Sequence, residues 1–403
     1  MSADAVRSGA RRSRTSLDLK RCALPESPGA PPSGRPVLLT PGPLALSAEV
    51  KEEMLVDLGS RSARMREITA RIRSSLLRLT GAEETHEAVP IQGSGSFATE
   101  AVISTFVSPS DVVLVVVSGV YGERIVQILE RRGIRHRILA CDPTSLPDPT
   151  AINEILSSDS TITHLCIVQC ETTTGLLLSV EKYSCVARAH GVITIVDAMS
   201  AFGAVPIDAR RDGFDVLIAS GNKCVEAPPG VAFALVQRGL LTRKTARSNS
   251  FCLDLYEQWS TLEQSGEWRS TPPTHVLQAL RAALESLEVE TVAGRAARYA
   301  AIRDQVVDGM SRLGFVPLLP APLRSPVCVA FTCPDWAGRE AGAFEAFYRY
   351  LDEAGIEIYS KLHLPTRSFR IGCIGRIEPH WIELFLERVE RFPSARAFAV
   401  SAA

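Results

Sequence analysis

The chain has 403 residues, of which 46% are hydrophobic and 22% are charged, and its formal net charge is −1. This length suits two lobes, and the apolar content is enough for a sizeable core. The balanced charge argues against a nucleic-acid binder, and no apolar run approaches the roughly 18 residues that a membrane span needs. Ten cysteines without a CxxC pair favour the reduced, buried thiols of a cytoplasmic protein over disulfides, and we expect no metal site.

Residues 1–36 differ in composition from the rest of the chain. They are rich in arginine, serine and proline, and they lack the apolar segment of a secretory signal. An organellar transit peptide has a similar composition, but Asp4 and Asp18 argue weakly against it. We therefore expect a disordered tail.

The middle of the chain alternates between predicted strands and predicted helices. Five runs are apolar throughout their length, which is typical of strands in a sheet that is covered on both faces. Helical patterns at 122–132 and 180–190 separate some of these runs. This order predicts an α/β fold with a mainly parallel central sheet. The predicted strands are 111–118, 163–169, 192–198, 215–220 and 230–236.

From Pro272 onward the pattern changes to long helices and short strands. Helical spacing covers "THVLQALRAALESLEVE" and then 295–313, and two further helices are expected at 341–354 and 379–392. Short strands are expected in "PVCVAFTC" and "GIEIYS". We therefore predict a large domain at 37–285 and a smaller α+β domain at 286–403.

Two charged residues follow neighbouring predicted strands. Asp197 closes "VITIVD", and Lys223 comes three residues after "DVLIAS". Ligands of open α/β sheets bind outside the carboxyl ends of the strands, so parallel strands would place both side chains on the ligand side. An aspartate there can pair with a protonated ring nitrogen, and a lysine there can hold an aldehyde. These are the two protein groups that pyridoxal phosphate requires.

A glycine- and serine-rich turn is a candidate phosphate site. Ser94, Gly95 and Ser96 in "QGSGSFATEA" lead directly into a predicted helix, whose first backbone N–H groups are free to bind an anion. The turn lacks the GK[ST] of a P-loop. It also lacks the third glycine of the dinucleotide fingerprint, and we expect no strand immediately before it. Taken alone, an ordinary glycine turn explains these residues equally well.

Two further segments follow predicted strands. Thr172 and Thr173 in "CETTTG" are candidates for binding a ring hydroxyl, although a threonine-rich turn accounts for them equally well. Tyr121 in "VYGER" is a candidate for stacking on a flat cofactor, and a half-buried core tyrosine is the alternative.

Together these segments resemble the class V, fold-type I aminotransferases that depend on pyridoxal phosphate, and they are most similar to the 2-aminoethylphosphonate–pyruvate aminotransferases. The resemblance extends from "LLTPGPL" at 38–44, through the segments above, to "EWRSTPPTH" at 267–275 and "FRIGCIG" at 369–375. It covers nearly everything after the tail. It implies a fold-type I transferase with a large cofactor-binding domain and a smaller C-terminal domain.

The resemblance also implies a role for each matching residue. Lys223 would hold the cofactor and move protons, and Asp197 would pair with the pyridine nitrogen. Arg370 would bind a substrate carboxylate, for which a planar guanidinium is suited. Thr271 would reach the cofactor phosphate of a neighbouring subunit in a homodimer. The remaining cofactor contacts would come from Ser94, Gly95, Ser96, Tyr121 and Thr172 or Thr173.

The implied reaction is transfer of an amino group from 2-aminoethylphosphonate or a related aminophosphonate to pyruvate. The alternatives are another class V aminotransferase, of the alanine/serine–glyoxylate type, or a lyase such as a cysteine desulfurase on the same scaffold. Desulfurases need a cysteine on a mobile loop, whereas Cys328 and Cys333 lie in a strand-like run. A non-catalytic protein of this fold is disfavoured, because Lys223, Asp197 and Arg370 are all present.

One segment departs from the family pattern. Residues 58–67 carry Arg61 and Arg64 where these enzymes tend to have a tryptophan and acidic residues. The basic residues would change the amino donor if they line the substrate mouth. A surface loop whose sequence differs from the family without affecting the substrate is an equally good explanation.

Overall fold

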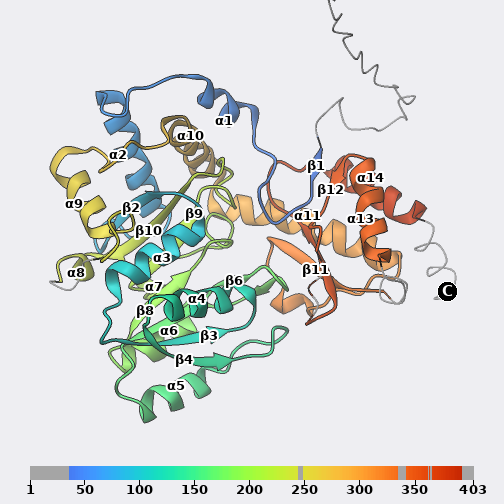
Figure 1. The fold of residues 1–403 in the computed structure, drawn as a ribbon. Coiled ribbons are helices and arrows are strands. Elements are labelled where there is room, and N and C mark those ends of the chain that lie inside the picture. Colours follow the sequence, from blue (N-terminus) through green and yellow to red (C-terminus); the bar gives the residue numbers. More distant parts are fainter. Residues whose placement is uncertain (1–35, 244–247, 335–341, 362, 364, 393–403) are drawn as a thin grey trace, which may run out of the picture.

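The computed structural model describes residues 36–243, 248–334, 342–361, 363 and 365–392 (Figure 1). The predicted N-terminal tail therefore lies outside the described residues, apart from Pro36. Within the described part of the chain, no helix is long and apolar enough to cross a membrane.

A seven-stranded sheet forms the centre of the larger part of the molecule, in the order β2-β10-β9-β8-β5-β3-β4. Strands β9, β8, β5, β3 and β4 are mutually parallel, whereas β10 runs antiparallel to both β9 and β2. The expected mainly parallel sheet is confirmed. The strands are β2 (His86–Gln92), β3 (Val112–Val117), β4 (Arg135–Ala140), β5 (His164–Val168), β8 (Ile193–Asp197), β9 (Val216–Ser220) and β10 (Val231–Gln237).

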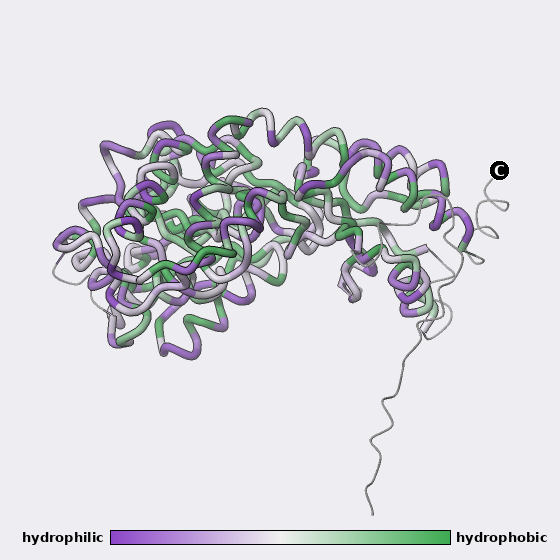
Figure 2. Tube along the Cα trace, turned by 90° about the horizontal axis from the view of Figure 1, so that it is seen from above, coloured by the Kyte–Doolittle hydropathy of each residue, from purple (hydrophilic) through white to green (hydrophobic). Residues whose placement is uncertain are grey.

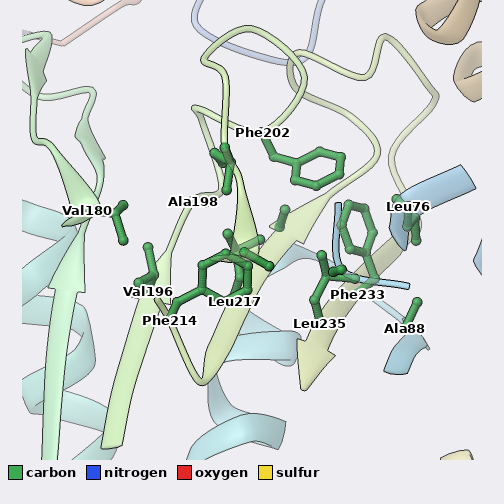
Figure 3. Packing of buried hydrophobic residues seen from close by; sticks show 14 of the residues in the cluster. Leu76, Ala88, Val180, Val196, Ala198, Phe202, Phe214, Leu217, Phe233 and Leu235 are labelled. Carbon is green, nitrogen blue, oxygen red and sulfur yellow. The ribbon is translucent and has the colours of Figure 1, made fainter. Parts of the chain in front are cut away.

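Helices cover both faces of this sheet, which explains why its central strands are apolar throughout. One face packs against helices that include α2, α6 and α10, and the other packs against α3 and α4. Figure 3 shows the first face, where Val196, Leu217 and Phe233 pack side by side. The helices of this part are α1 (Ala48–Glu52), α2 (Ala63–Arg78), α3 (Gly95–Phe106), α4 (Val120–Arg131), α5 (Pro149–Ser158), α6 (Val180–Ala189), α7 (Ala209–Asp212), α8 (Arg238–Leu241), α9 (Leu255–Ser265) and α10 (Thr274–Glu290), with a short 3-10 turn η1 (Glu53–Leu55).

One strand corrects the sequence analysis. β2 ends at Gln92, immediately before the Gly93–Ser96 turn, where we expected no strand. Pro90 lacks a backbone N–H and so argues against a central strand. β2 lies at the edge of the sheet and pairs only with β10, and an edge strand tolerates a proline.

The C-terminal part has its own apolar cluster and short β-pairs. Its cluster joins residues of α11, α13 and α14 with β11 and β13. Strand β1 pairs with β12 here, so the segment after the tail lies beside the C-terminal part (Figure 1). The proposed domain limits of 37–285 and 286–403 stay a prediction. The elements are β1 (Val37–Leu38), α11 (Val292–Arg312), η2 (Ala321–Leu323), β11 (Cys328–Thr332), α13 (Ala343–Glu353), β12 (Ile356–Glu357), β13 (Ser368–Gly372) and α14 (Pro379–Arg391).

Apolar segments lie inside both parts, and polar segments follow the outer turns (Figure 2). Between the two parts a small buried cluster includes Leu44, Cys224, Tyr299 and Ile374, which come from four distant segments. A two-stranded pair, β6 (Cys170–Glu171) with β7 (Leu176–Leu177), lies beside the C-terminal part, because Leu176 also bridges to Arg324. The turn after β9 and the turn between β6 and β7 therefore lie near the junction between the two parts.

Candidate active site

The carboxyl ends of β8 and β9 carry the two residues that the sequence analysis singled out. These strands are parallel, with Asp197 opposite Ile218, so both end at the same edge of the sheet. β8 ends at Asp197, and the turn after β9 presents Lys223. Val196 and Ala198 point into the apolar cluster (Figure 3), so the intervening Asp197 faces the α3 and α4 side.

A cavity of about 200 Å³ lies at this edge. It brings together six of the predicted site residues, which come from four separate segments of the chain. They are Ser94, Gly95, Ser96, Tyr121, Asp197 and Lys223. The other lining residues are Thr99, Arg124, Ile125, Met199, Ser220 and Asn222.

Asp197 is a buried carboxylate with little compensation from protein groups. Its side chain is 6% exposed, and Oδ1 accepts one hydrogen bond, from the Met199 backbone N–H at 2.9 Å. Burial raises the pKa of Asp197 to about 6, although the Met199 bond and the charges of Arg124 and Lys223 act in the opposite direction. A positively charged ligand atom beside this carboxylate would therefore be strongly favoured.

Lys223 lies against the segment that begins "LLTPGPL". Its Nζ donates a hydrogen bond to the Pro41 carbonyl at 2.8 Å. A Cβ atom on Gly42 would lie 2.6 Å from Nζ, so only glycine leaves room for the lysine. Burial lowers the pKa of Lys223, and the charge of Arg370 acts in the same direction. A lowered pKa increases the fraction of neutral amine, which is the form that attacks a carbonyl.

The first turn of α3 forms the floor of the cavity. Ser94 is the N-cap residue, but its hydroxyl makes no capping bond. Phe97 N–H and Ala98 N–H bond to the Ser94 carbonyl, while the N–H groups of Gly95 and Ser96 precede them at the helix start, where helices bind anions. A Cβ on Gly95 would collide with the Met199 side chain, which would have to move.

Tyr121 and Arg124 line the cavity from α4. Tyr121 is half-buried and packs on the apolar cluster of the α3–α4 side, and it also lines the cavity. Its stacking on a flat cofactor stays a prediction. The Arg124 guanidinium lies 4.9 Å from the centre of the Tyr121 ring. Its Nη1 also donates to Ser96 Oγ at 3.2 Å, which places a positive charge beside the α3 turn.

The two threonines of "CETTTG" have different surroundings. The Thr173 hydroxyl and backbone N–H both donate to the buried carboxylate of Glu171. The Thr172 hydroxyl is buried near the Tyr121 phenol; burial raises the pKa of this phenol, and the Thr172 hydroxyl acts in the opposite direction. Neither threonine lines the cavity, so a contact of either one with a bound ring stays a prediction.

Arg370 lies on β13, in the C-terminal part. It is 7% exposed, and Nη1 donates to the Thr172 carbonyl at 2.8 Å. Its guanidinium lies 4.1 Å from the centre of the Tyr359 ring. Arg370 does not line the cavity itself, but its charge acts on Lys223.

Two sequence-selected segments lie apart from this cavity. Thr271 is exposed just before α10 and is absent from the cavity lining. Arg61 is 78% exposed, and its Nε lies 3.6 Å from Glu267. Neither Arg61 nor Arg64 lines the cavity, which favours the surface-loop interpretation of residues 58–67.

Sequence reasoning missed two residues of this site, and both carried a usable signal. Arg124 follows Tyr121 by three positions, so the two share one helix face. Glu171 is a carboxylate at the end of an apolar run, which is the signal that identified Asp197. It accepts a bond from Tyr121 N–H at 3.2 Å, and burial raises its pKa. Glu171 therefore joins the start of α4 to the turn that carries Thr172.

The described residues contain no group of His, Cys, Asp and Glu side chains suited to hold a metal ion. The nine cysteines among them are all free thiols. Burial raises the pKa of all five buried thiols and also of the half-buried thiol of Cys141. The buried thiols are Cys166, Cys170, Cys224, Cys328 and Cys373.

The chain is similar in sequence to named enzymes over most of its length. Residues 47–363 match the family model for class V aminotransferases. A 2-aminoethylphosphonate–pyruvate transaminase of Paraburkholderia xenovorans is 40% identical over 359 residues, covering 89% of this chain and 92% of that protein. A second, from Burkholderia pseudomallei, is 42% identical over 347 residues, covering 86% and 93%.

Solved structures share the fold. The alanine–glyoxylate aminotransferase of Nostoc sp. superposes with a TM-score of 0.81 at 24% identity, covering 91% of this chain and 97% of that one. The pyridoxamine–pyruvate aminotransferase of Mesorhizobium loti gives a TM-score of 0.77 at 22% identity, covering 92% and 94%. The resemblance found in the sequence is thus confirmed: the chain is an enzyme that belongs to the class V aminotransferases.

Proposed function

We propose that this enzyme uses pyridoxal 5′-phosphate to move the amino group of 2-aminoethylphosphonate to pyruvate, giving phosphonoacetaldehyde and alanine. The observation that carries the proposal is the convergence of Lys223, Asp197 and the α3 turn on one cavity. The substrate assignment is supported by the names of relatives that are 40% and 42% identical over most of both chains.

The residues of the cavity fit this cofactor. The free N–H groups at the start of α3 and the hydroxyls of Ser94 and Ser96 suit its phosphate, with Arg124 adding a positive charge. Among the described residues, Asp197 forms no ion pair, and it suits a protonated ring nitrogen. The Ser220 hydroxyl lines the cavity and is buried without a hydrogen-bond partner among the described residues, so a bound polar group would satisfy it.

When bound, pyridoxal phosphate would supply an electron sink for the negative charge that develops on the substrate carbon. Asp197 would keep the ring nitrogen protonated. Lys223 Nζ would hold the cofactor aldehyde, and its amine would then carry protons to and from the nitrogen-bearing carbon of the substrate. Tyr121 would shield the ring from water.

Arg370 binds the carboxylate of pyruvate. Its bond to the Thr172 carbonyl and its contact with Tyr359 hold the guanidinium in place, so little conformational freedom is lost when a carboxylate binds. The dianionic head of an aminophosphonate suits the same group. Arg370 thus serves both half-reactions in turn.

We also propose a homodimer in which Thr271 approaches the partner's cofactor phosphate. The position of Thr271 is compatible with this role, because the residue is exposed and lies away from its own cavity. The free thiols suit a reducing, cytoplasmic setting. Partial restoration of activity on mixing inactive Lys223→Ala and Thr271→Ala proteins would support the shared site, and a fully active monomer would exclude it.

The desulfurase alternative finds no support in the positions of the late cysteines. Cys328 is buried in β11, and burial raises the pKa of its thiol to about 11. Cys333 is half-buried just after that strand. A nucleophilic cysteine needs access and a lowered pKa.

A donor screen tests the proposal. The protein loaded with pyridoxal phosphate is mixed with 2-aminoethylphosphonate, alanine, serine or cysteine in the absence of an oxo acid, and the cofactor spectrum is followed. We expect rapid conversion with 2-aminoethylphosphonate and with alanine, and phosphonoacetaldehyde as the product of the former. Conversion with serine and alanine but none with the phosphonate would overturn the substrate assignment and leave the family assignment intact.

A further inference from the structure

Behind the Lys223 turn, on the side away from the cavity, lies a second buried carboxylate. Glu226 is 3% exposed and has a backbone φ of 64°, a left-handed conformation that is unusual for a residue other than glycine. Its N–H donates to the Lys223 carbonyl at 2.8 Å, and Ala227 N–H donates to the Gly221 carbonyl at 2.9 Å. These two bonds close the turn that presents Lys223.

The Glu226 side chain points toward α11 and the segment after β13. Oε1 lies 2.7 Å from Arg298 Nη2 and accepts a bond from the Tyr299 hydroxyl at 2.6 Å. Oε2 lies 2.9 Å from Arg376 Nε. Both oxygens of this carboxylate are therefore used, and every partner belongs to the C-terminal part.

A second arginine of α11 holds the backbone of the same turn. Arg295 is completely buried, and Nη1 donates to the carbonyls of Cys224 at 2.9 Å and Val225 at 3.1 Å. Glu290 lies 2.8 Å from Arg295 and 2.6 Å from Arg298, which orients both guanidinium groups. The cluster thus holds two carboxylates against three arginines.

The cluster also reaches the strand that carries Arg370. Arg298 Nη1 donates to the Gly375 carbonyl at 2.8 Å, and Arg376 is the next residue. Both lie three or four residues after β13, which ends at Gly372. A single carboxylate therefore connects the turn of the proposed cofactor lysine to the end of the strand of the proposed substrate arginine.

We propose that Glu226 is a positioning residue that fixes the separation between the Lys223 amine and the Arg370 guanidinium. Both of its oxygens are taken by groups of the C-terminal part and it does not line the cavity, so it acts through the turn and the strand. The phosphate turn of α3 and Asp197 belong to the large sheet and do not depend on this connection. Loss of Glu226 should therefore weaken binding of the carboxylate substrate far more than binding of the cofactor. This inference rests on the roles proposed above for Lys223 and Arg370.

Hydrogen exchange of the protein without cofactor tests whether Glu226 holds the turn that presents Lys223. Glu226→Gln removes the charge but keeps the size of the side chain. Glu290→Gln is the matched control, because it removes an equal charge from the same cluster but reaches the Lys223 turn only through Arg295. We expect exchange in the peptide that contains residues 221–227 to be at least about tenfold faster in Glu226→Gln, because stability here reflects local opening of the turn. Glu290→Gln should give a clearly smaller acceleration in this peptide.

Kinetics and cofactor titration test whether loss of Glu226 weakens substrate binding more than cofactor binding. We expect the KM for pyruvate to rise about tenfold or more in Glu226→Gln, with the Kd for pyridoxal phosphate within about threefold of the wild type. Arg376→Gln, at a residue 38% exposed, removes only the connection to the strand end and provides a milder variant if Glu226→Gln fails to fold. Arg376→Gln should raise the KM for pyruvate and leave exchange of 221–227 unchanged.

Two results would overturn the inference. One is a lower melting temperature for Glu226→Gln with unchanged exchange at 221–227 and unchanged KM, because the cluster would then be purely a stabilising feature. The other is a parallel loss of cofactor affinity and substrate affinity, because the whole site would then have been disturbed. The exchange experiment needs no substrate, so a failure of the proposed substrate assignment remains distinguishable from a failure of this inference.

Discussion

Two buried carboxylates flank Lys223, and their surroundings are opposite. Asp197, on the cavity side, accepts one backbone hydrogen bond, and burial raises its pKa to about 6. Glu226, behind the turn, meets two guanidinium groups and a phenol within 2.9 Å. The charge of Asp197 is left for a ligand to neutralise, whereas groups of the chain itself neutralise the charge of Glu226.

This difference separates a binding site from a scaffold by a physical criterion. A buried charge without a partner costs stability, and proteins retain such groups where a function needs them. A buried charge that is fully paired contributes rigidity, and removing one partner leaves the others uncompensated. Burial by itself therefore identifies neither role, whereas burial combined with the state of pairing does.

The largest expected effect is at the lysine that both carboxylates adjoin. Lys223→Ala should reduce transamination by about 10⁴-fold or more, because the chain loses both the amine that holds the aldehyde and the proton carrier. Borohydride treatment of the loaded protein, followed by peptide mapping, should show no labelled lysine. Covalent labelling at a different lysine would show that Lys223 has been assigned the wrong role.

The next effect concerns the cavity carboxylate. Asp197→Asn should lower kcat by about 10³-fold, which corresponds to about 4 kcal/mol in the barrier, because a neutral amide no longer keeps the ring nitrogen protonated. Steady-state kinetics after saturation with pyridoxal phosphate measures this effect. Nearly normal turnover with bound cofactor would show that Asp197 is not needed to keep the ring nitrogen protonated.

A smaller effect is expected at the substrate arginine. Arg370→Ala should raise the KM for pyruvate about 100-fold, because a charge-assisted bidentate contact is lost. Cofactor affinity should change little, because Arg370 does not line the cavity. Arg370→Lys is the matched control, and it should recover only part of the loss, since an ammonium group lacks the planar pair of donors. An unchanged KM in the alanine variant would place the substrate carboxylate elsewhere.

The two carboxylates should differ most clearly in how each affects the stability of the protein without cofactor. At pH 8, Asp197→Asn should increase the free energy of unfolding by up to about 3 kcal/mol, because the buried charge is removed while the Met199 bond is kept. Glu226→Gln should decrease it by about 3 kcal/mol. Urea titration measures both, and a change of the same sign in the two variants would remove the distinction.

The pH dependence of the Asp197 effect has a defined sign. The carboxyl pKa is about 6 in the folded protein against an ordinary value of 3.8, so the folded state binds more protons between these values. Its contribution to stability therefore falls as the pH rises from about 4 to about 6 and stays low above that. The advantage of Asp197→Asn should be small near pH 4 and complete by pH 7. A gain in stability that does not change with pH would show that packing causes it, and not the removal of the charge.

The smallest effect is expected at the altered loop. Arg61→Ala should change kcat/KM for 2-aminoethylphosphonate by less than about twofold and stability by less than about 0.5 kcal/mol, because Arg61 is 78% exposed and its ion pair with Glu267 is 3.6 Å long. Arg64→Ala provides the parallel test. A selective loss with the phosphonate donor in either variant would restore the loop as part of the substrate mouth.

The sequence was most informative where a strand is buried on both faces. The runs at 163–169, 192–198 and 215–220 appear as β5, β8 and β9, because complete burial requires an unbroken apolar stretch. Edge strands lack this requirement. β2 contains Pro90, and β4 is largely exposed, so neither has the pattern of a buried strand. The antiparallel direction of β10 likewise leaves no trace in its composition.

The sequence by itself determined which reactive groups the chain carries and in what order, and this order was enough to identify the family. Tertiary structure decided which groups meet. Glu226 and Arg298 are 72 residues apart, and Thr172 and Arg370 are 198 apart. Such contacts depend on how helices pack across the junction, and no local pattern encodes them. The same packing gives Asp197 an uncompensated charge and Glu226 a compensated one, although both are carboxylates near the end of an apolar run.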